Sequence, residues 1–238
     1  MNKYLAEIGG IHAGDGYLRY NKKYNELDIS GSLEEKEYYD KHISFLFQKA
    51  FNLKIKTRYF PSRNTYGFTT TNRNVIKNLQ NLGFPSGKKS TIVKIPDEIL
   101  KNKFLVRYFL RGYFDTDGCL TFGKKYGTCS KFKKTRHCYP RLIFTTVSKP
   151  LAKDLEKIFE RLSFNALKYE YKPKILTENL KIKFFINGAN NLKLWLKLIG
   201  IGNPTKYSRY LIWKKYGFCP PNTNQQCIVA LEGLLAKD

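Results

Sequence analysis

The stretch of sequence that decides the fold occurs twice. Residues Ile8–Gly16 read IGGIHAGDG, and residues Leu110–Gly118 read LRGYFDTDG. Both copies begin with an apolar residue, carry glycine at the third place and end in Asp-Gly, and the two aspartates, Asp15 and Asp117, are 102 residues apart. A pattern that recurs at this distance indicates two similar structural units in one chain.

Each copy is followed by the same succession of element patterns. In the first half, strand patterns cover 17–20, 27–30, 54–59 and 66–70, and helical patterns cover 34–51 and 72–82. In the second half, strand patterns cover 119–122, 141–146, 167–172 and 181–186, and helical patterns cover 150–162 and 190–199. The sequence therefore predicts an α+β fold of two pseudo-symmetric halves, residues 1–100 and 101–238, each ordered α-β-β-α-β-β-α.

The end of each half carries a further repeat. Gly83 and Gly200 stop the last predicted helix of their halves, as glycine does at helix C-termini. A lysine follows each glycine by six residues, Lys89 in the first half and Lys206 in the second.

The composition narrows the class of protein. The 238 residues include 43 Lys and Arg against 19 Asp and Glu, a formal net charge of +24, with 42% hydrophobic and 15% aromatic residues. Such a chain can form a core, so a disordered basic tail is excluded. There is no apolar run long enough for a membrane span, no secretory pattern at the N-terminus, and five cysteines are not a disulfide framework. The charge predicts a nucleic-acid partner inside the cell, and general lysine enrichment of the source proteome is the alternative explanation.

The predicted strands carry basic residues on one face. Side chains alternate between faces along a strand, which puts Lys54, Lys56 and Arg58 on one side of the run 54–59. Lys181 and Lys183 likewise share one side of the run 181–186. We expect each sheet to pack its apolar face on helices and to turn a cationic face outward, toward nucleic acid.

The two Asp-Gly motifs predict a metal site. Gly10 and Gly112 lie in the middle of predicted helices, where glycine costs about 1 kcal/mol relative to alanine. Close packing of the two helices would explain both glycines, and parallel packing would bring Asp15 and Asp117 together at one end. Two adjacent carboxylates favour a divalent cation such as Mg²⁺ between them, which suits phosphodiester hydrolysis.

At this point the chain resembles a known family, the LAGLIDADG homing endonucleases in their single-chain, two-motif form. The stretch 109–118, FLRGYFDTDG, is similar to the second motif of that family, and IGGIHAGDG is a looser first motif. The resemblance implies αββαββα halves with the motif helices at the central interface and antiparallel sheets forming a saddle over DNA. It also implies that Asp15 and Asp117 bind the catalytic metals with the backbone carbonyls of Gly14 and Thr116.

The resemblance further implies a basic residue near each metal, which Lys89 and Lys206 match by position, with Lys88 as the substitute for Lys89. The implied activity is double-strand cleavage of a long, asymmetric DNA site with short 3′ overhangs, by a monomer that uses Mg²⁺ or, in its place, Mn²⁺. Residue 1 is neither Cys nor Ser and there is no terminal His-Asn, so we expect an intron-encoded or free-standing protein rather than an intein. The alternatives are an RNA maturase that binds intron RNA, a catalytically degenerate DNA-binding protein and, on charge alone, a ribosome-associated protein.

The segment 123–139 is expected to be a long basic hairpin that is mobile without DNA, and 219–238 a tail that ends in a short helix at 225–237. Zinc binding by Cys129, His137 and Cys138 fits no standard spacing, and His12 is expected to be structural. The residues expected to contact DNA are Tyr17, Arg19, Lys22, Lys23, Lys54, Lys56, Arg58, Lys124, Lys125, Lys131, Lys133, Lys134, Arg136, Arg141, Lys168, Lys172, Lys181 and Lys183.

Overall fold

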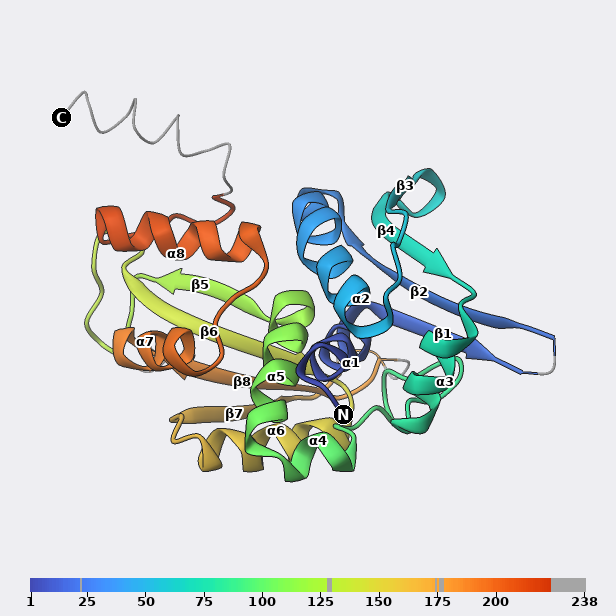
Figure 1. Cartoon of the computed structure of the whole chain (residues 1–238). Coiled ribbons are helices and arrows are strands. Elements are labelled where there is room, and N and C mark those ends of the chain that lie inside the picture. Colours follow the sequence, from blue (N-terminus) through green and yellow to red (C-terminus); the bar gives the residue numbers. More distant parts are fainter. Residues whose placement is uncertain (22, 128–129, 174, 176–177, 224–238) are drawn as a thin grey trace.

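A computed structural model describes residues 1–21, 23–127, 130–173, 175 and 178–223 (Figure 1). The first half contains α1 (Lys3–Asp15), β1 (Gly16–Tyr20), β2 (Asn25–Ser32), η1 (Leu33–Glu35), η2 (Tyr38–Ile43), α2 (Ser44–Phe51), β3 (Arg58–Phe60), η3 (Pro61–Arg63), β4 (Thr65–Thr70) and α3 (Arg73–Asn81). The second contains α4 (Asp97–Lys101), α5 (Lys103–Asp117), β5 (Cys119–Gly123), β6 (Tyr139–Thr146), α6 (Lys149–Arg161), β7 (Ala166–Tyr171), β8 (Lys181–Asn187), α7 (Ala189–Leu198) and α8 (Pro204–Tyr216).

The two halves have the same sheet topology. The first sheet has the strand order β1-β2-β4-β3 and the second β5-β6-β8-β7, and every neighbouring pair is antiparallel. Tyr17 and Cys119 stand at the same place after their motif aspartates. Tyr17 lies opposite Asp28 and Cys119 opposite Ile143, so Asp28 and Ile143 are the corresponding residues of the second strands. The predicted α+β architecture of two similar halves is confirmed.

The ends of the helices follow local sequence rules. The side chains of Asn2 and Asn102 accept hydrogen bonds from the first turns of α1 and α5, and Ser148 caps α6 in the same way. Gly83 and Gly200, just beyond α3 and α7, have φ of +85° and +83°, a conformation that glycine adopts without steric cost.

Helices α1 and α5 lie side by side between the two sheets (Figure 1). A Cβ on Gly10 would collide with the carbonyl oxygen of Phe109 and lie 2.8 Å from the nitrogen of Tyr113. A Cβ on Gly112 would collide with the carbonyl oxygen of Glu7 and lie 2.9 Å from the nitrogen of Ile11. Gly14, one turn after Gly10, lies against Thr116 and Asp117, so the contacts advance in the same direction along both helices, which are therefore parallel. Their backbones meet at Gly10 and Gly112.

Several sequence-based boundaries were wrong. The stretch 34–51, expected as one helix, consists of 3-10, π and α turns. The spacing of apolar residues is similar in these three kinds of helix, so the sequence does not distinguish them. The strand expected over 54–59 joins the sheet only at Arg58–Phe60, and Thr57 instead donates its hydroxyl to Asp40. Helices α4 and α8 were not expected.

Other expectations are settled only in part. His12 is fully buried with its ring edge-on to Phe84, and burial lowers its pKa to about 3, which fits a neutral, structural side chain. The tail helix expected at 225–237 lies outside the described residues. No helix in the described part of the chain is long and apolar enough to cross a membrane.

Candidate metal centre and nucleic-acid interface

Asp15 and Asp117 end the two parallel motif helices, at the same end of the central interface. A Cβ on Gly14 would collide with the Thr116 hydroxyl and would lie 3.3 Å from the carboxyl carbon of Asp117. Tyr39 donates a hydrogen bond of 3.1 Å to Oδ2 of Asp15. The last residues of α1 and α5 are therefore in contact across the interface.

The electrostatics of the pair favour a cation. Burial raises the pKa of Asp15 to about 7, and the negative charges of Asp117 and Glu35 add to the rise. Burial also raises the pKa of Asp117, while the positive charges of Lys89 and Lys206 act against it. Ionised carboxylates are thus costly here unless a further positive charge compensates them, which a divalent cation would do.

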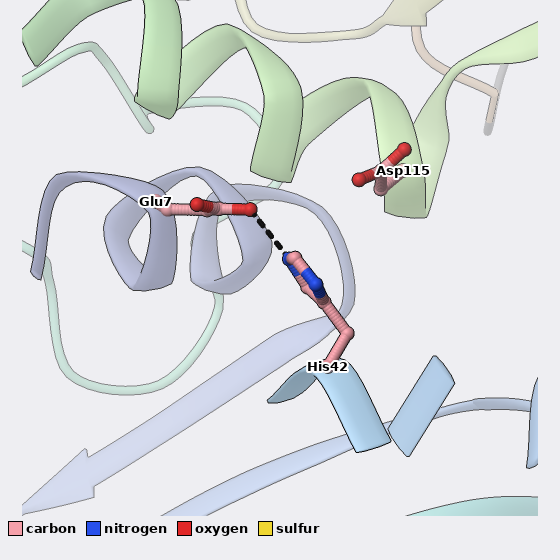
Figure 2. A group of neighbouring side chains, drawn as sticks. All are labelled: Glu7, His42 and Asp115. Atoms are coloured by element: carbon pink, nitrogen blue, oxygen red, sulfur yellow. Dashed lines mark hydrogen bonds and ion pairs between the residues drawn. The ribbon is translucent and has the colours of Figure 1, made fainter. Parts of the chain in front are cut away.

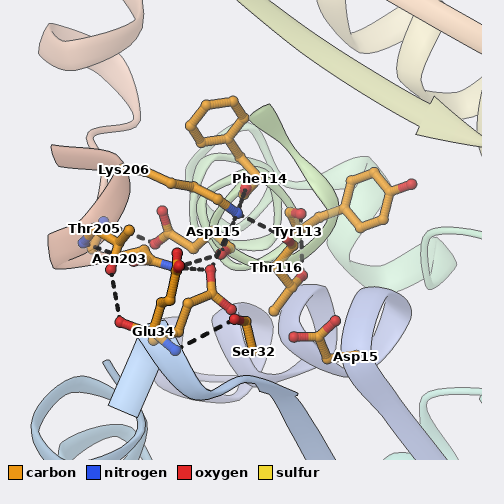
Figure 3. Close-up of polar contacts among 12 residues, drawn as sticks. Asp15, Ser32, Glu34, Tyr113, Phe114, Asp115, Thr116, Asn203, Thr205 and Lys206 are labelled. Carbon is orange, nitrogen blue, oxygen red and sulfur yellow. Dashed lines mark hydrogen bonds and ion pairs between the residues drawn. The ribbon is translucent and has the colours of Figure 1, made fainter. Parts of the chain in front are cut away.

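Two lysines hold the ends of the motif helices. Nζ of Lys89 donates to the carbonyls of Ala13 at 2.9 Å and Gly14 at 2.7 Å. Nζ of Lys206 donates to the carbonyls of Phe114, Asp115 and Thr116 at 3.0, 2.6 and 2.7 Å, as Figure 3 shows. A cation at a helix C-terminus stabilises the partial negative charge of the free carbonyls.

Different elements bring these two lysines to matching places. Lys89 comes from the segment between α3 and α4, whereas Lys206 comes from the first turn of α8. The carbonyls of Gly14 and Thr116, expected to face metals, are each hydrogen-bonded to a lysine. A carbonyl oxygen has two lone pairs, so a lysine contact leaves room for a second partner.

Two cavities lie beside the helix ends, and each takes residues from both halves. One, of about 230 Å³, is lined by Gly14, Lys89 and Asp117, with Tyr113 and Lys181 among the others. The second, of about 500 Å³, is lined by Glu35, Thr116 and Lys206 among others. We name Gly14, Lys89 and Asp117 the Asp117 centre, and Asp15, Glu35, Thr116 and Lys206 the Asp15 centre.

Glu35, Tyr39 and Asn203 are site residues that the sequence analysis missed. Oε1 of Glu35 accepts a hydrogen bond of 2.6 Å from Asn203 and lies 3.9 Å from Nζ of Lys206. Burial raises the pKa of Glu35. The motif spacing gives no signal for these side chains, which come from elements far from the motifs in sequence.

Figure 2 shows a separate cluster of Glu7, His42 and Asp115, whose ligand atoms all lie within 4.8 Å of one another. Nε2 of His42 is 2.7 Å from Oε1 of Glu7, and Arg111 donates to both oxygens of Glu7. Burial alone would raise the pKa of Glu7, but His42 and Arg111 lower it. Burial raises the pKa of Asp115 to about 7.

The guanidinium of Arg111 already supplies positive charge to this cluster, which therefore functions as an ion-pair network between α1 and α5. Arg111 occupies the second place of its motif, where the first motif has Gly9, and it pairs with Glu7 of the other motif helix.

The outer face of the second sheet combines cations with aromatic rings. Tyr169 lies opposite Lys183, and Tyr171 opposite Lys181, so all four share one face. Arg141 of β6 lies on the same face and donates to Asn187 at 2.9 Å. Tyr169 and Tyr171 are exposed.

The face predicted for Lys168 was wrong. Lys168 lies opposite the buried Phe184 and forms an ion pair of 3.1 Å with Glu156 of α6, so it belongs to the helix-covered face. Strand β7, residues 166–171, lies at the sheet edge and is exposed on both faces. Its sequence therefore lacks the alternation of apolar and polar residues that would show which face is buried. Lys172 follows the strand and is exposed.

The first sheet is less uniformly basic than expected. Tyr17 and Arg19 are exposed and share their face with their partners Asp28 and Glu26, and Asp28 forms an ion pair of 2.8 Å with Arg63. Four of the remaining residues expected to contact DNA are exposed: Arg58 in β3, Lys54 and Lys56 before it, and Lys23 after β1. The fifth, Lys22, lies outside the described residues.

The basic hairpin joins β5 to β6 as expected. Lys125, Lys131, Lys133, Lys134 and Arg136 are exposed, and Lys124 is half-buried. The base of the hairpin is fixed by a hydrogen bond from the Lys134 nitrogen to the Lys124 carbonyl, and His137 contacts the Phe122 carbonyl at 2.8 Å. Mobility of the hairpin stays a prediction, and Cys129 of the proposed zinc set lies outside the described residues.

Two parallel motif helices that each end in an aspartate, set between two antiparallel sheets, form the two-motif LAGLIDADG fold. Residues 104–200 match the family model of the LAGLIDADG-like domain. The second half of the chain is thus similar to a LAGLIDADG-like domain, and the first half repeats its motif and its sheet topology.

Solved structures of two homing endonucleases share this fold. A structure of mesophilic variants of I-DmoI superimposes with a TM-score of 0.54 at 15% identity, covering 83% of this chain and 95% of that one. I-SmaMI bound to uncleavable DNA gives a TM-score of 0.55 at 11% identity, covering 98% of this chain and 96% of that one. Another I-DmoI structure, in complex with DNA and Mn, gives a TM-score of 0.54 at 15% identity, covering 83% and 96% of the two chains.

A curated relative is the replication factor C small subunit of Methanocaldococcus jannaschii. It is 29% identical over 213 residues, which cover 88% of this chain and 10% of that protein. The chain thus spans about a tenth of the length of this relative, and an intron-encoded or free-standing protein stays a prediction.

Proposed function

We propose that the protein is a site-specific DNA endonuclease that hydrolyses one phosphodiester bond in each strand, with Mg²⁺ as its divalent cation and Mn²⁺ as a substitute. The observation that carries this proposal is the pair of centres at the helix ends. Asp117, Lys89 and Gly14 line one cavity between the halves, and Thr116 and Lys206, which lie near Asp15, line the other. A protein that only binds nucleic acid has no need of two carboxylates with raised pKa values at such cavities.

The residues fit a hard divalent cation, since carboxylate and carbonyl oxygens are its preferred ligands. Asp15 and Asp117 would hold the metals, with the carbonyls of Thr116 and Gly14 close by. A bound cation would polarise the phosphate and lower the pKa of an attacking water. Lys89 and Lys206 position the helix ends and place positive charge beside the phosphate as negative charge develops on its oxygens.

The sheets would position the DNA. Cations on the second sheet and the hairpin, Arg141, Lys181 and Lys183 among them, suit phosphate contacts, and the tyrosines beside them suit contacts with base edges and sugars. The two sheets differ in charge, which favours an asymmetric target. I-DmoI has been solved in complex with DNA and Mn, and I-SmaMI bound to DNA in the presence of calcium ions. By analogy we propose a long DNA site, short 3′ overhangs and a monomer in contact with DNA inside the cell.

A selection and cleavage experiment tests the proposal. Duplexes retained from a random library by the metal-free protein, together with the joined DNA flanks of the reading frame, would be incubated with Mg²⁺, with Mn²⁺ or with chelator. We expect a double-strand cut at one site with either metal and none with chelator. Asp117→Asn should retain binding and make no double-strand cut. Tight binding without any metal-dependent cut by the unaltered protein would contradict the proposal.

A further inference from the structure

Glu35 lies in the short 3-10 turn that directly follows β2. The Ser32 side chain accepts a hydrogen bond of 3.3 Å from the Glu34 nitrogen, which turns the chain inward at this point. The Glu35 carboxylate is then held by Asn203 of the second half and lies beside Lys206. These contacts of Glu35 are with the start of α8 in the other half, and its side chain is only 14% exposed.

The other oxygen of Glu35 approaches Asp15. A Cβ on Gly31 would lie 2.8 Å from Oδ2 of Asp15 and 3.1 Å from Oε2 of Glu35, so both carboxylates converge on the same bare stretch of backbone. The hydroxyl of Tyr39 lies 2.7 Å from that point and donates to Asp15. The absence of a side chain at residue 31 lets the two acids come together.

The second half has no counterpart of Glu35. The motif positions and strand registers match Asp28 with Ile143, which places Pro150 at the position of Glu35 and Lys149 at that of Glu34. Among the residues that line the cavity of the Asp117 centre, Asp117 is the one acid, and both Lys89 and Lys181 are present. The Asp15 centre therefore holds two acids, Asp15 and Glu35, where the Asp117 centre holds one.

Resting on the proposed function, we propose that Glu35 is a second carboxylate ligand for the divalent cation at the Asp15 centre, with no equivalent at the Asp117 centre. Two carboxylates attract a hard cation more strongly than one, because affinity rises with the number of charged oxygen ligands. The Asp15 centre fills first as the metal concentration rises. The strand that it serves is cut at metal concentrations at which the other strand stays intact.

The direct test is metal binding without DNA. Free Mn²⁺ would be measured by electron paramagnetic resonance during titration of the unaltered protein, Glu35→Gln, Asp117→Asn and Glu37→Gln. We expect a tighter and a weaker class of site, and about a tenfold loss of affinity in the tighter class in Glu35→Gln. Asp117→Asn should weaken the other class, and Glu37→Gln, an exposed residue paired with Lys41, should behave as the unaltered protein.

The second readout is the order of strand cleavage. On a duplex with a different label on each strand, limiting Mn²⁺ should give a nick mainly in one strand, and Glu35→Gln should abolish that preference. Equal Mn²⁺ affinities in the unaltered protein and Glu35→Gln would overturn the proposal. If Glu35→Gln does not fold, Glu35→Asp provides the same comparison, with weakening of the tighter class as support and unchanged affinity as refutation.

These readouts separate the two proposals. A protein that binds Mn²⁺ through Glu35 but cuts no DNA would contradict the endonuclease function and leave the ligand assignment standing. A protein that cuts both strands equally at every metal concentration, with an unaltered Mn²⁺ titration in Glu35→Gln, would contradict the ligand assignment alone.

Discussion

Gly10 of α1 and Gly112 of α5 are reciprocal contacts. Each faces backbone atoms of the other helix, where an added Cβ would collide with the carbonyl oxygen of Phe109 or of Glu7. This relationship sets the distance between the motif helices, and with it the distance between the acids at their ends. The two glycines therefore connect the packing of the core to the geometry of the site.

Replacing either glycine with alanine should destabilise the protein. In Gly10→Ala the new methyl group meets rigid backbone, so we expect a loss of about 3 kcal/mol or more in the free energy of unfolding, at or above the upper end for overpacked cores. Gly9→Ala on the same helix is the matched control. Its methyl group would lie 3.5 Å from Phe84, an ordinary contact, and the change favours helix by up to about 1 kcal/mol. Urea unfolding of both variants checks this, and equal stabilities would contradict the close-packing account.

The raised pKa of Asp15 should make the metal-free protein less stable at high pH. The pKa of Asp15 in the folded protein is about 7, above its ordinary value, so folding favours the protonated acid. This contribution to stability is complete below about pH 4 and is lost as the pH rises through 7. We expect Asp15→Asn to be more stable than the unaltered protein at pH 8, by roughly 2 to 4 kcal/mol, and equal to it near pH 4.

Divalent metal should reverse that difference. At pH 8, Mg²⁺ should raise the unfolding midpoint of the unaltered protein more than that of Asp15→Asn, which keeps the Asp117 centre alone, because binding to the folded state adds stability. Thermal unfolding with and without Mg²⁺ would measure both effects. A stability difference that does not vary with pH would argue against a raised pKa at Asp15.

Lys206 should matter for cutting more than for binding. Lys206→Met removes three hydrogen bonds to the end of α5 and the positive charge of the Asp15 centre. We expect cleavage of one strand to fall about 100-fold, as on loss of a single stabilising donor, while DNA affinity should change by less than about threefold. Lys214→Met, an exposed position on the same helix, is the control, and strand-resolved kinetics with an equal loss in both variants would contradict the assignment.

The faces of β7 and β8 predict opposite effects of two lysine substitutions. Lys183→Ala removes a cation from the outer face of the second sheet, so DNA affinity should fall for all sequences. The slope of log affinity against log salt should decrease in magnitude by about 0.9 for each phosphate that the variant no longer neutralises. Lys168→Ala removes a partner of Glu156 on the helix side and should leave the slope unchanged. Fluorescence anisotropy at several salt concentrations distinguishes the two, and a reduced slope for Lys168→Ala would show that β7 binds DNA through its other face.

The fold was largely predictable because its determinants are local and repeated. The glycine at the third motif place, the aspartate at the end and the glycine after each last helix act through backbone geometry that any copy of the motif must satisfy. The placement of Asp15, Asp117, Lys89 and Lys206 at the helix ends was predictable because each lies at a fixed distance from these markers, and their roles stay predictions.

Glu35 and the orientation of Lys168 were beyond the sequence for a different reason. Glu35 gains its place from Asn203 and Lys206, which are distant in the sequence, and no periodicity reports such a contact. The faces of β7 are set by its register with β8, while its own residues are exposed on both sides. Helix α8 was missed because its apolar residues, four of them consecutive, do not form one helical stripe, although Asn203 and Pro204 form a typical helix start.

Both centres draw on residues from each half, and this has a consequence for how such a protein can change. Under the proposed function, recognition could diverge one sheet at a time, since each sheet is built from one half of the chain. A single half could not be catalytic on its own, because it would hold an aspartate without the backbone carbonyl that the other half supplies to the same centre. A chimera that joins halves of two different proteins would therefore need a complementary interface between its motif helices. That interface would have to keep the contact between the two glycines and an ion pair equivalent to Glu7–Arg111.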